Sequence, residues 1–321
     1  MTSSSKLLAN KNKLSIFRNR NKIWLASSLA LVISIIGFLY SSFSPEIGLP
    51  LRPGIDFTGG TQIRIDRKCE NECSKISSES VNNALNNISF SDKQQGRKIA
   101  AAKVQFLDEY KSLLIRLPSL SPSVSQTVIK SIKNIAGPYE IDGQSIETIG
   151  PTLGSELLRT SLKSLFIAFI GVALYISIRF DRRLSVYALL ALLHDVVIVC
   201  GVFSWLGILF EVEINSLFAV ALLTIAGYSV NDTVVVFDRI RELNRQESKL
   251  SNSQKIDIAV SATLTRTIYT SGTTLLPLFA LIFFGGNSLY WFSVALAIGV
   301  IVGSWSSIAL VPSILTLIKD N

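Results

Sequence analysis

Six long apolar stretches constrain the fold of this chain more than any other feature of its sequence. About 20 consecutive apolar residues are enough for a helix to cross the hydrocarbon core of a bilayer. The predicted fold class is therefore an α-helical membrane protein with six transmembrane helices. A hydrophobic content of 49% with only 17% charged residues agrees with this, excludes a disordered chain and disfavours a soluble enzyme. The stretches lie at residues 23–43, 159–178, 184–208, 214–238, 267–286 and 289–318.

The formal net charge of +8 would suit a nucleic-acid-binding protein, so the positions of the charges matter. Residues 1–22 hold six basic residues and no acidic one, whereas residues 44–160 hold 14 basic and 13 acidic residues. The basic excess therefore lies in a short N-terminal arm and not on a large domain. Such an arm is typical of an orientation signal, and we expect no nucleic-acid partner.

The basic residues of the short connections predict how the chain is oriented in the membrane. The connection at 179–183 carries three basic residues and one acidic residue, and the connection at 239–266 carries six basic residues. The opposite connections are acidic or neutral. We therefore expect both termini and a loop at 239–266 in the cytoplasm, and residues 44–158 on the extracytoplasmic side. The first span is predicted to remain as an anchor, in a plasma (inner) membrane or an internal photosynthetic membrane.

Residues 44–158 show alternating strand-like patterns separated by helix-like stretches. The order β-α-β-β-α-β is that of a ferredoxin-like domain. The segment contains no acid–base cluster, glycine-rich phosphate loop or histidine. We therefore expect a binding or mechanical domain with no catalytic site and no cofactor. The expected elements are, in chain order, 61–66, 75–89, 99–107, 112–117, 123–136 and 145–149.

Two of the three cysteines, Cys69 and Cys73, lie in this extracytoplasmic segment. A pair in an oxidising compartment can form a disulfide, and the sequence leaves this open. The spacing also occurs in metal sites, but no histidine or further cysteine accompanies the pair, so no metal is expected. Cys200 lies within the third span and is interpreted as a small buried residue.

Ionisable residues inside apolar spans are costly and are therefore hypotheses about function. Asp232 lies in the fourth span, on the same helix face as Tyr228 and beside Asn231. Arg266 begins the fifth span. Because one loop joins these two spans, Asp232 and Arg266 lie toward the same side of the membrane and could face each other.

Burial favours the neutral form of such an acid, whereas a nearby arginine favours the carboxylate. The two effects oppose each other, which predicts that Asp232 gains and loses a proton during function. The alternative is a static ion pair that only holds two helices together. His194 and Asp195 lie near the middle of the third span, and for them a proton path and simple helix packing are both open.

Several stretches resemble the SecD/SecF family, which supplies membrane subunits of the bacterial Sec protein-export machinery and belongs to the resistance-nodulation-division superfamily. The longest stretch, at 223–242, is the most specific, and the resemblance extends from the first span to the last. The matching stretches are Gly54–Thr61, Ile149–Gly154, Leu193–Asp195, Leu223–Glu242, Thr265–Thr274 and Phe283–Gly286.

The resemblance implies one half of a transporter whose partner, SecD, supplies the other six spans. It also implies association with the SecYEG channel and use of the proton-motive force to assist a late, outer-side stage of preprotein translocation. Asp232 and Arg266 match the positions that the family assigns to proton coupling. The first matching stretch supplies a family motif, interpreted as a hinge, in Gly54, Asp56, Gly59 and Gly60.

Two other functions are compatible with the residues alone. One is a small-molecule or lipid exporter of the same superfamily, although such exporters usually carry both six-span halves in one chain. The other is a non-transporting assembly factor that uses Asp232 and Arg266 only for packing. In none of these three cases do we expect an enzyme.

Overall fold

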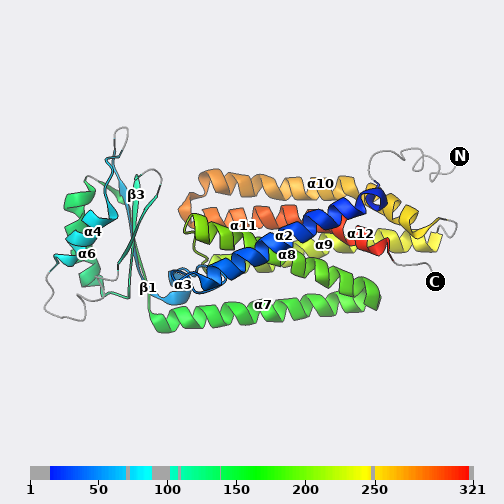
Figure 1. The fold of residues 1–321 in the computed structure, drawn as a ribbon, viewed down its shortest axis with the longest axis horizontal. Coiled ribbons are helices and arrows are strands. Elements are labelled where there is room, and N and C mark those ends of the chain that lie inside the picture. Colours follow the sequence, from blue (N-terminus) through cyan, green and yellow to red (C-terminus); the bar gives the residue numbers. More distant parts are fainter. Residues whose placement is uncertain are drawn as a thin grey trace. The chain divides into compact units, whose positions relative to one another are not determined.

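The structure is a computed structural model that describes residues 15–69, 73–88, 102–107, 110–137, 139–246 and 250–317. The chain forms two compact units. Met1–Arg52 and Leu162–Asn321 make a bundle of helices, and Pro53–Ser161 makes an inserted domain. Figure 1 shows the long helices of the bundle and the strands and helices of the inserted domain.

Within the described residues, six helices of the chain are long and apolar enough to cross a membrane. Each contains most of one predicted span, which confirms the predicted fold class. The helices are α2 (Ile16–Phe43), α7 (Pro151–Arg179), α8 (Arg182–Leu209), α9 (Ser216–Gln246), α10 (Asn252–Phe284) and α11 (Gly286–Trp305), the last continued by η1 (Ser306–Leu310) and α12 (Val311–Leu315).

The segment 239–266, predicted as a loop, is helical over most of its length, and that prediction was wrong. Helix α9 continues to Gln246, and α10 already begins at Asn252. The hydropathy pattern marks where apolar residues end, whereas buried Leu243 and Ile256 keep both helices packed beyond that point. A capping box at Ser251 fixes the start of α10.

The last predicted span is not one regular helix. A π-helical turn, η1, follows α11 and precedes α12. Such turns are rare and often occur at functional sites. This turn carries Ser306 and Ser307, both fully buried, so it faces the interior of the bundle.

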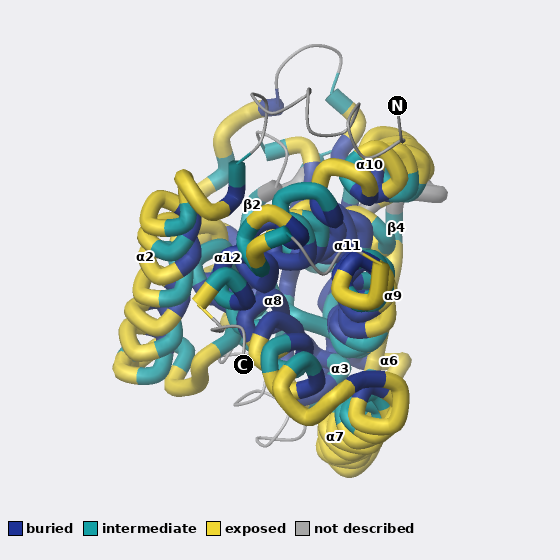
Figure 2. Tube along the Cα trace, turned by 90° about the vertical axis from the view of Figure 1, so that its right-hand side faces the viewer, coloured by how far each residue is buried: buried dark blue, intermediate teal, exposed yellow. Residues whose placement is uncertain are grey.

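The centre of the bundle is formed by α8, α9 and the α11–α12 segment. In the most apolar 18 residues of each of these helices, 56% of the residues are buried, whereas in the corresponding part of α7 only 6% are buried. Figure 2 shows the contrast between the exposed tube of α7 and the buried inner faces of α8 and α11. Helix α2 packs along α8. The outer helices therefore present apolar surface outward, as expected for contact with lipid or partner helices.

Glycines permit the close helix contacts at the centre of the bundle. A Cβ atom at Gly299 would lie 2.3 Å from the Ile225 side chain, and one at Gly201 would lie 2.2 Å from the Ser34 side chain. Both glycines therefore let two helices approach more closely than any other residue would allow.

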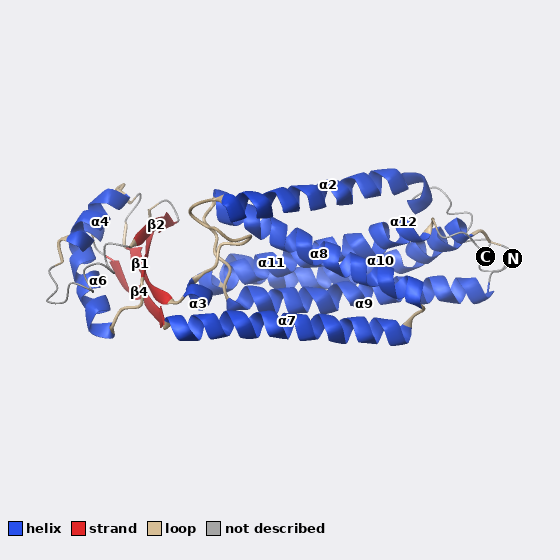
Figure 3. Ribbon diagram, turned by 60° about the horizontal axis from the view of Figure 1, so that its bottom comes forward, coloured by secondary structure: helices blue, strands red, loops and turns tan. Residues whose placement is uncertain are grey.

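The inserted domain has the predicted β-α-β-β-α-β order. Its sheet is antiparallel, with strand order β2-β3-β1-β4, which is the ferredoxin-like arrangement. Helices α4 and α6 cover one face of the sheet (Figure 3). The elements are β1 (Gly60–Arg67), α4 (Ser78–Asn86), β2 (Lys103–Leu107), β3 (Ser112–Leu117), α6 (Pro122–Ala136) and β4 (Tyr139–Ile149).

The alternation of apolar residues in the strands produces the core of this domain. Ile63 and Ile65 on β1 and Ile115 on β3 are fully buried, and they pack against Val81 and Ile132 of the two helices. Strand β4 is longer than predicted. The predicted strand residues 99–101 lie outside the described part of the chain.

The glycine motif forms the entry to the domain. Gly54 precedes the short helix α3 (Ile55–Thr58), which contains Asp56, and Gly59 and Gly60 lead into β1. Gly59 has a φ of +70°, and a Cβ atom there would lie 2.7 Å from Cα of Pro151. Only glycine fits this position, because both the conformation and the space exclude a side chain.

Cys69 and Cys73 form a disulfide just beyond β1, with their Cα atoms 5.4 Å apart. The guanidinium of Arg67 is held nearby by the carbonyl oxygens of Ser74 and Tyr110, at 3.0 and 2.9 Å. The disulfide thus joins two residues that follow β1, and Arg67 at the end of β1 hydrogen-bonds to Ser74 just after the second cysteine.

Candidate functional site

Both carboxyl oxygens of Asp195 on α8 have hydrogen-bond partners. Its side chain is fully buried and is contacted from three directions. Nδ1 of His194 lies 2.9 Å from Oδ1, and the hydroxyls of Ser229 and Ser306 donate to Oδ2 at 2.6 and 2.7 Å. We call these four residues the Asp195 cluster. They connect α8, α9 and the π-helical turn η1.

The backbone around the Asp195 cluster explains how so many groups converge on one carboxyl. Gly303 lies close to Ser229, because a Cβ atom at this glycine would be only 3.2 Å from Cβ of Ser229. The missing side chain therefore leaves room for the serine. The turn η1 places Ser306 inward. His194 is buried as well, and no described residue supplies a hydrogen-bond partner for its Nε2. One ring nitrogen is therefore held by Asp195 while the other is left as an unused donor or acceptor.

A second polar contact lies beside this cluster. The hydroxyl of Tyr228 on α9 lies 3.0 Å from Oγ of Ser271 on α10, which in turn lies 2.6 Å from Oγ of Ser304 on α11. We call these three residues the hydroxyl chain. Tyr228 and Ser229 are consecutive on α9, so this helix links the hydroxyl chain to the Asp195 cluster.

Asp232 lies one helical turn beyond Tyr228 and Ser229 on α9. Its side chain is only 3% exposed, yet none of the described residues forms a hydrogen bond with its Oδ2. Arg266 on α10 interacts with this carboxyl through its charge but forms no ion pair with it among the described residues. The two predicted partners thus lie on neighbouring helices without direct contact, and Arg266 is exposed on the surface of the isolated chain.

The structure separates the other predicted residues. Asn231 is exposed and lines a hollow of about 300 Å³ between α7 and α9, together with Gly171 and Tyr175. It therefore does not join Asp232. The hydroxyls of Thr270, Thr273 and Thr274 on α10 bond to carbonyl oxygens of their own helix. These threonines keep their polar groups satisfied within the span and contact no acid.

Sequence reasoning missed the serines that complete these clusters. Ser229, Ser271, Ser304 and Ser306 each lie in a transmembrane span. Ser229 precedes Asp232 by one turn, but this spacing does not show that its hydroxyl turns to Asp195. A serine in a span is common, because its hydroxyl can bond to its own helix.

The arrangement places three ionisable side chains in the interior of the bundle. Asp195, His194 and Asp232 provide two carboxyls and one imidazole within the bundle, and hydroxyls connect the helices that carry them. Among the described residues no group of three or more His, Cys, Asp or Glu residues could hold a metal ion. Buried ionisable groups of this kind mark proton relays in transport proteins.

Fold and site together define a class: a multi-pass membrane protein with buried acids in its helix bundle and one inserted ferredoxin-like domain. Residues 127–321 match the family described as protein export membrane protein SecD/SecF, C-terminal, and residues 47–69 match the SecD/SecF GG motif. The chain belongs to the SecF group of the SecD/SecF family and is an auxiliary subunit of the Sec protein translocase.

Individual relatives agree with this assignment. The chain is 65% identical over 321 residues, all of both chains, to the protein translocase subunit SecF of Prochlorococcus marinus. It is 39% identical over 296 residues to that of Synechocystis, which covers 92% of this chain and 91% of the relative.

A solved structure matches the fold as well. The crystal structure of SecDF from Thermus thermophilus, described as a translocon-associated membrane protein, matches with a TM-score of 0.76 and 30% sequence identity. The match covers 95% of this chain and 38% of the other. The chain thus spans well under half the length of that SecDF.

Proposed function

We propose that this chain, together with a SecD partner, uses the proton-motive force to assist a late, outer-side stage of preprotein translocation. The observation that carries the proposal is Asp232, a buried carboxyl whose Oδ2 lacks a hydrogen-bond partner among the described residues. A structural acid at this depth is expected to be satisfied, as Asp195 is. An acid that changes its protonation state must keep at least one carboxyl oxygen available to bind the proton.

Proton binding at Asp232 would act through Arg266. The attraction between the two side chains exists only while Asp232 is ionised, so protonation removes it and changes how α9 and α10 are held. Each proton that crosses the membrane releases about 2.3 kcal/mol per 100 mV, which is comparable to the energy of a helix rearrangement. The Asp195 cluster and the hydroxyl chain would transmit the change, because both are attached to α9 one turn away.

The partner is inferred from the relatives. The SecDF of Thermus thermophilus is 33% identical to this chain over 298 residues, which make up only 37% of its own length. A chain that matches one part of a fused protein is expected to associate with a separate copy of the other part. We therefore expect a SecD-type subunit to co-purify with this chain, and we place SecYEG and preproteins among its partners.

A translocation assay tests the coupling. In membrane vesicles with an imposed proton gradient, Asp232→Asn should abolish the part of precursor export that depends on the gradient. The matched control is Asp181→Asn, which removes an exposed carboxyl at the start of α8. Equal gradient dependence in Asp232→Asn and the wild type would leave only the assembly-factor function.

The orientation in the inner membrane is a separate proposal. Basic residues gather in the turn between α7 and α8 and around the junction of α9 and α10, so we place both in the cytoplasm and the inserted domain outside. Cysteines introduced at the exposed positions Asn244 and Glu156 test this placement. An impermeant thiol reagent applied to whole cells should label the cysteine at 156 and not the one at 244; the opposite pattern would reverse the orientation.

A further inference from the structure

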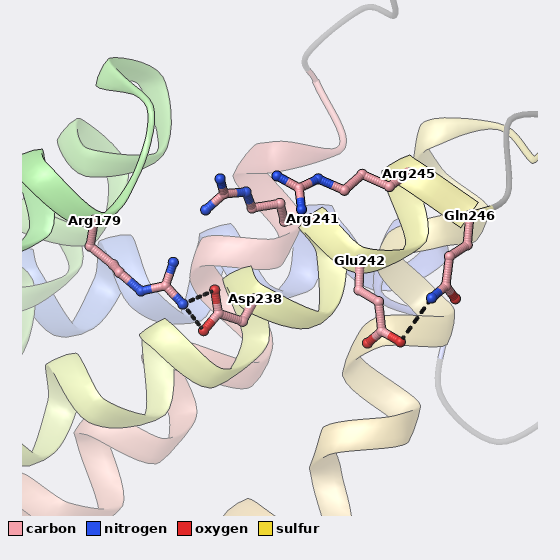
Figure 4. A pocket seen from close by; sticks show the side chains of 6 residues that line it. All are labelled: Arg179, Asp238, Arg241, Glu242, Arg245 and Gln246. Carbon is pink, nitrogen blue, oxygen red and sulfur yellow. Dashed lines mark hydrogen bonds and ion pairs between the residues drawn. The ribbon is translucent and has the colours of Figure 1, made fainter.

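We propose that an open hollow formed by the ends of α7 and α9 binds the phosphate group of an anionic phospholipid. The hollow has a volume of about 470 Å³, within the range of ligand pockets. It lies within the bundle unit, apart from the Asp195 cluster and the hydroxyl chain. We call it the arginine hollow, and it is lined by Arg179, Asp238, Arg241, Glu242, Arg245 and Gln246 (Figure 4).

Both acids of the arginine hollow already have partners. Nη2 of Arg179 donates to Oδ1 and Oδ2 of Asp238 at 2.8 and 2.7 Å. Glu242 accepts a hydrogen bond from Arg239, and a further one from Nε2 of Gln246 at 3.3 Å. Arg179 therefore balances the charge of Asp238, and Arg239, which does not line the hollow, balances the charge of Glu242.

Two positive charges remain. Arg241 and Arg245 are four residues apart on α9, and their side chains extend in the same direction (Figure 4). No ion pair or hydrogen bond joins either side chain to another described residue. Like charges at this spacing repel each other. An anion between the two guanidinium groups would replace that repulsion with two attractions.

The chemistry of the two side chains favours a phosphate group. The planar fork of a guanidinium matches two phosphate oxygens at once, which a lysine cannot do. Two such forks on one helix face can both donate hydrogen bonds to a single phosphate. The Asp238–Arg179 pair joins α9 to α7 and lines the rest of the hollow with Glu242 and Gln246.

The surroundings of the hollow favour a lipid as the source of the phosphate. Leu174 and Ile178, in the last turns of α7 before Arg179, are 59% and 87% exposed. An apolar surface next to a basic hollow at the end of a transmembrane helix matches the acyl chains and headgroup of one phospholipid. Basic pockets between transmembrane helices bind anionic lipid headgroups in this way. An acidic protein segment would match the charges but not the apolar flank.

The test measures lipid binding to the purified full chain in detergent by native mass spectrometry. The probes are phosphatidylglycerol, phosphatidylcholine and inorganic phosphate, with a glutamate-rich peptide as the rival ligand. The variant R241Q/R245Q removes the two unpartnered charges. Its matched control, R182Q/R183Q, removes two exposed arginines from the neighbouring turn, which do not line the hollow.

Wild type and R182Q/R183Q should bind phosphatidylglycerol at least fivefold more tightly than phosphatidylcholine, and R241Q/R245Q should lose this preference. If R241Q/R245Q keeps the preference, the proposal is wrong. It is equally wrong if inorganic phosphate or the acidic peptide displaces the lipid at equal concentration, since the ligand would then not be a lipid. Arg245→Gln alone, an exposed single change, decides the question if the double variant does not fold.

Discussion

Two buried aspartates show how differently the same residue type is used inside one bundle. Asp195 receives three hydrogen bonds from three elements, whereas Asp232, about one turn from the cluster along α9, has an oxygen without any partner in the described residues. The first arrangement links three elements of the bundle, and the second leaves free the oxygen that the proposed proton coupling requires. Burial alone does not distinguish the two, because both side chains are almost fully enclosed.

The serines of the Asp195 cluster should contribute to stability. Ser229→Ala or Ser306→Ala removes one hydrogen bond to Oδ2, and each should lower the free energy of unfolding by about 0.6 to 1.7 kcal/mol, the range for interhelical hydrogen bonds in membranes. Unfolding in mixed detergent micelles measures the change. Ser261→Ala is the control, because its hydroxyl bonds only to its own helix. If Ser229→Ala and Ser306→Ala lower the free energy of unfolding no more than Ser261→Ala does, the Asp195 cluster does not stabilise the fold.

Asp232 and Arg266 should behave as one functional unit. Asp232→Asn and Arg266→Gln should each abolish gradient-dependent export, and the double variant should be no worse than either single one, because residues acting as a unit are not additive. Export rates with and without a gradient provide the measurement. If the two single changes lowered the export rate by independent factors that multiply in the double variant, the pairing of Asp232 with Arg266 would be contradicted.

At the residue scale, the sequence predicts the ionisable groups but not their partners. Asp195, Asp232 and Arg266 are conspicuous because charge is rare in apolar spans. Ser229 and Ser306 are not, since a serine in a span has a carbonyl of its own helix within reach. Only packing decides that these two turn to a neighbouring helix, so their role could not be predicted.

The helices and strands follow closely from the sequence, while their ends and irregularities do not. All six spans and the order of the inserted domain follow from apolar periodicity. The parts of α9 and α10 that extend past the predicted spans, and the π-helical turn η1, depend on tertiary contacts and on backbone hydrogen bonds that periodicity does not encode. The turn η1 is the irregular element that brings Ser306 to Asp195.

The contact between α2 and α8 should depend on Gly201. Gly201→Ala places a methyl group 2.2 Å from the Ser34 side chain and 2.7 Å from its Cα, so the helices must separate at a cost of about 1 to 3 kcal/mol. Gly272→Ala, on α10, has no atom within 4 Å of the new methyl group and should be neutral or slightly stabilising. Thermal unfolding of the two variants compares them. Equal stability would show that the close approach is not required.

The glycine motif allows a similar comparison within the inserted domain. Gly59 and Gly137 have φ values of +70° and +77°, but only Gly59 is enclosed. Gly137→Ala should cost about 1 to 3 kcal/mol for the backbone alone, because a φ of +77° with a ψ of −166° is a conformation that essentially only glycine adopts. Gly59→Ala should cost more, because the new methyl group meets Cα of Pro151. Hydrogen exchange of the β1 amides in the full chain would reveal the difference, and equal protection in both variants would contradict it.

At the scale of the whole molecule, a bundle with ionisable side chains in its interior is combined with an inserted ferredoxin-like domain. The outer surfaces of α7 and α10 are left largely uncovered by the chain itself, as expected for half of a larger membrane assembly. Three basic residues near the ends of α7 and α9, Arg179, Arg241 and Arg245, line the arginine hollow.

Proton flux through the reconstituted complex tests the central claim most directly. The chain and its SecD partner, placed in liposomes with an internal pH-sensitive dye, should dissipate an imposed proton gradient while a precursor is being translocated. Asp232→Asn should abolish this flux, and Asp181→Asn should leave it unchanged. A flux in Asp232→Asn equal to that of the wild type would contradict proton coupling through Asp232.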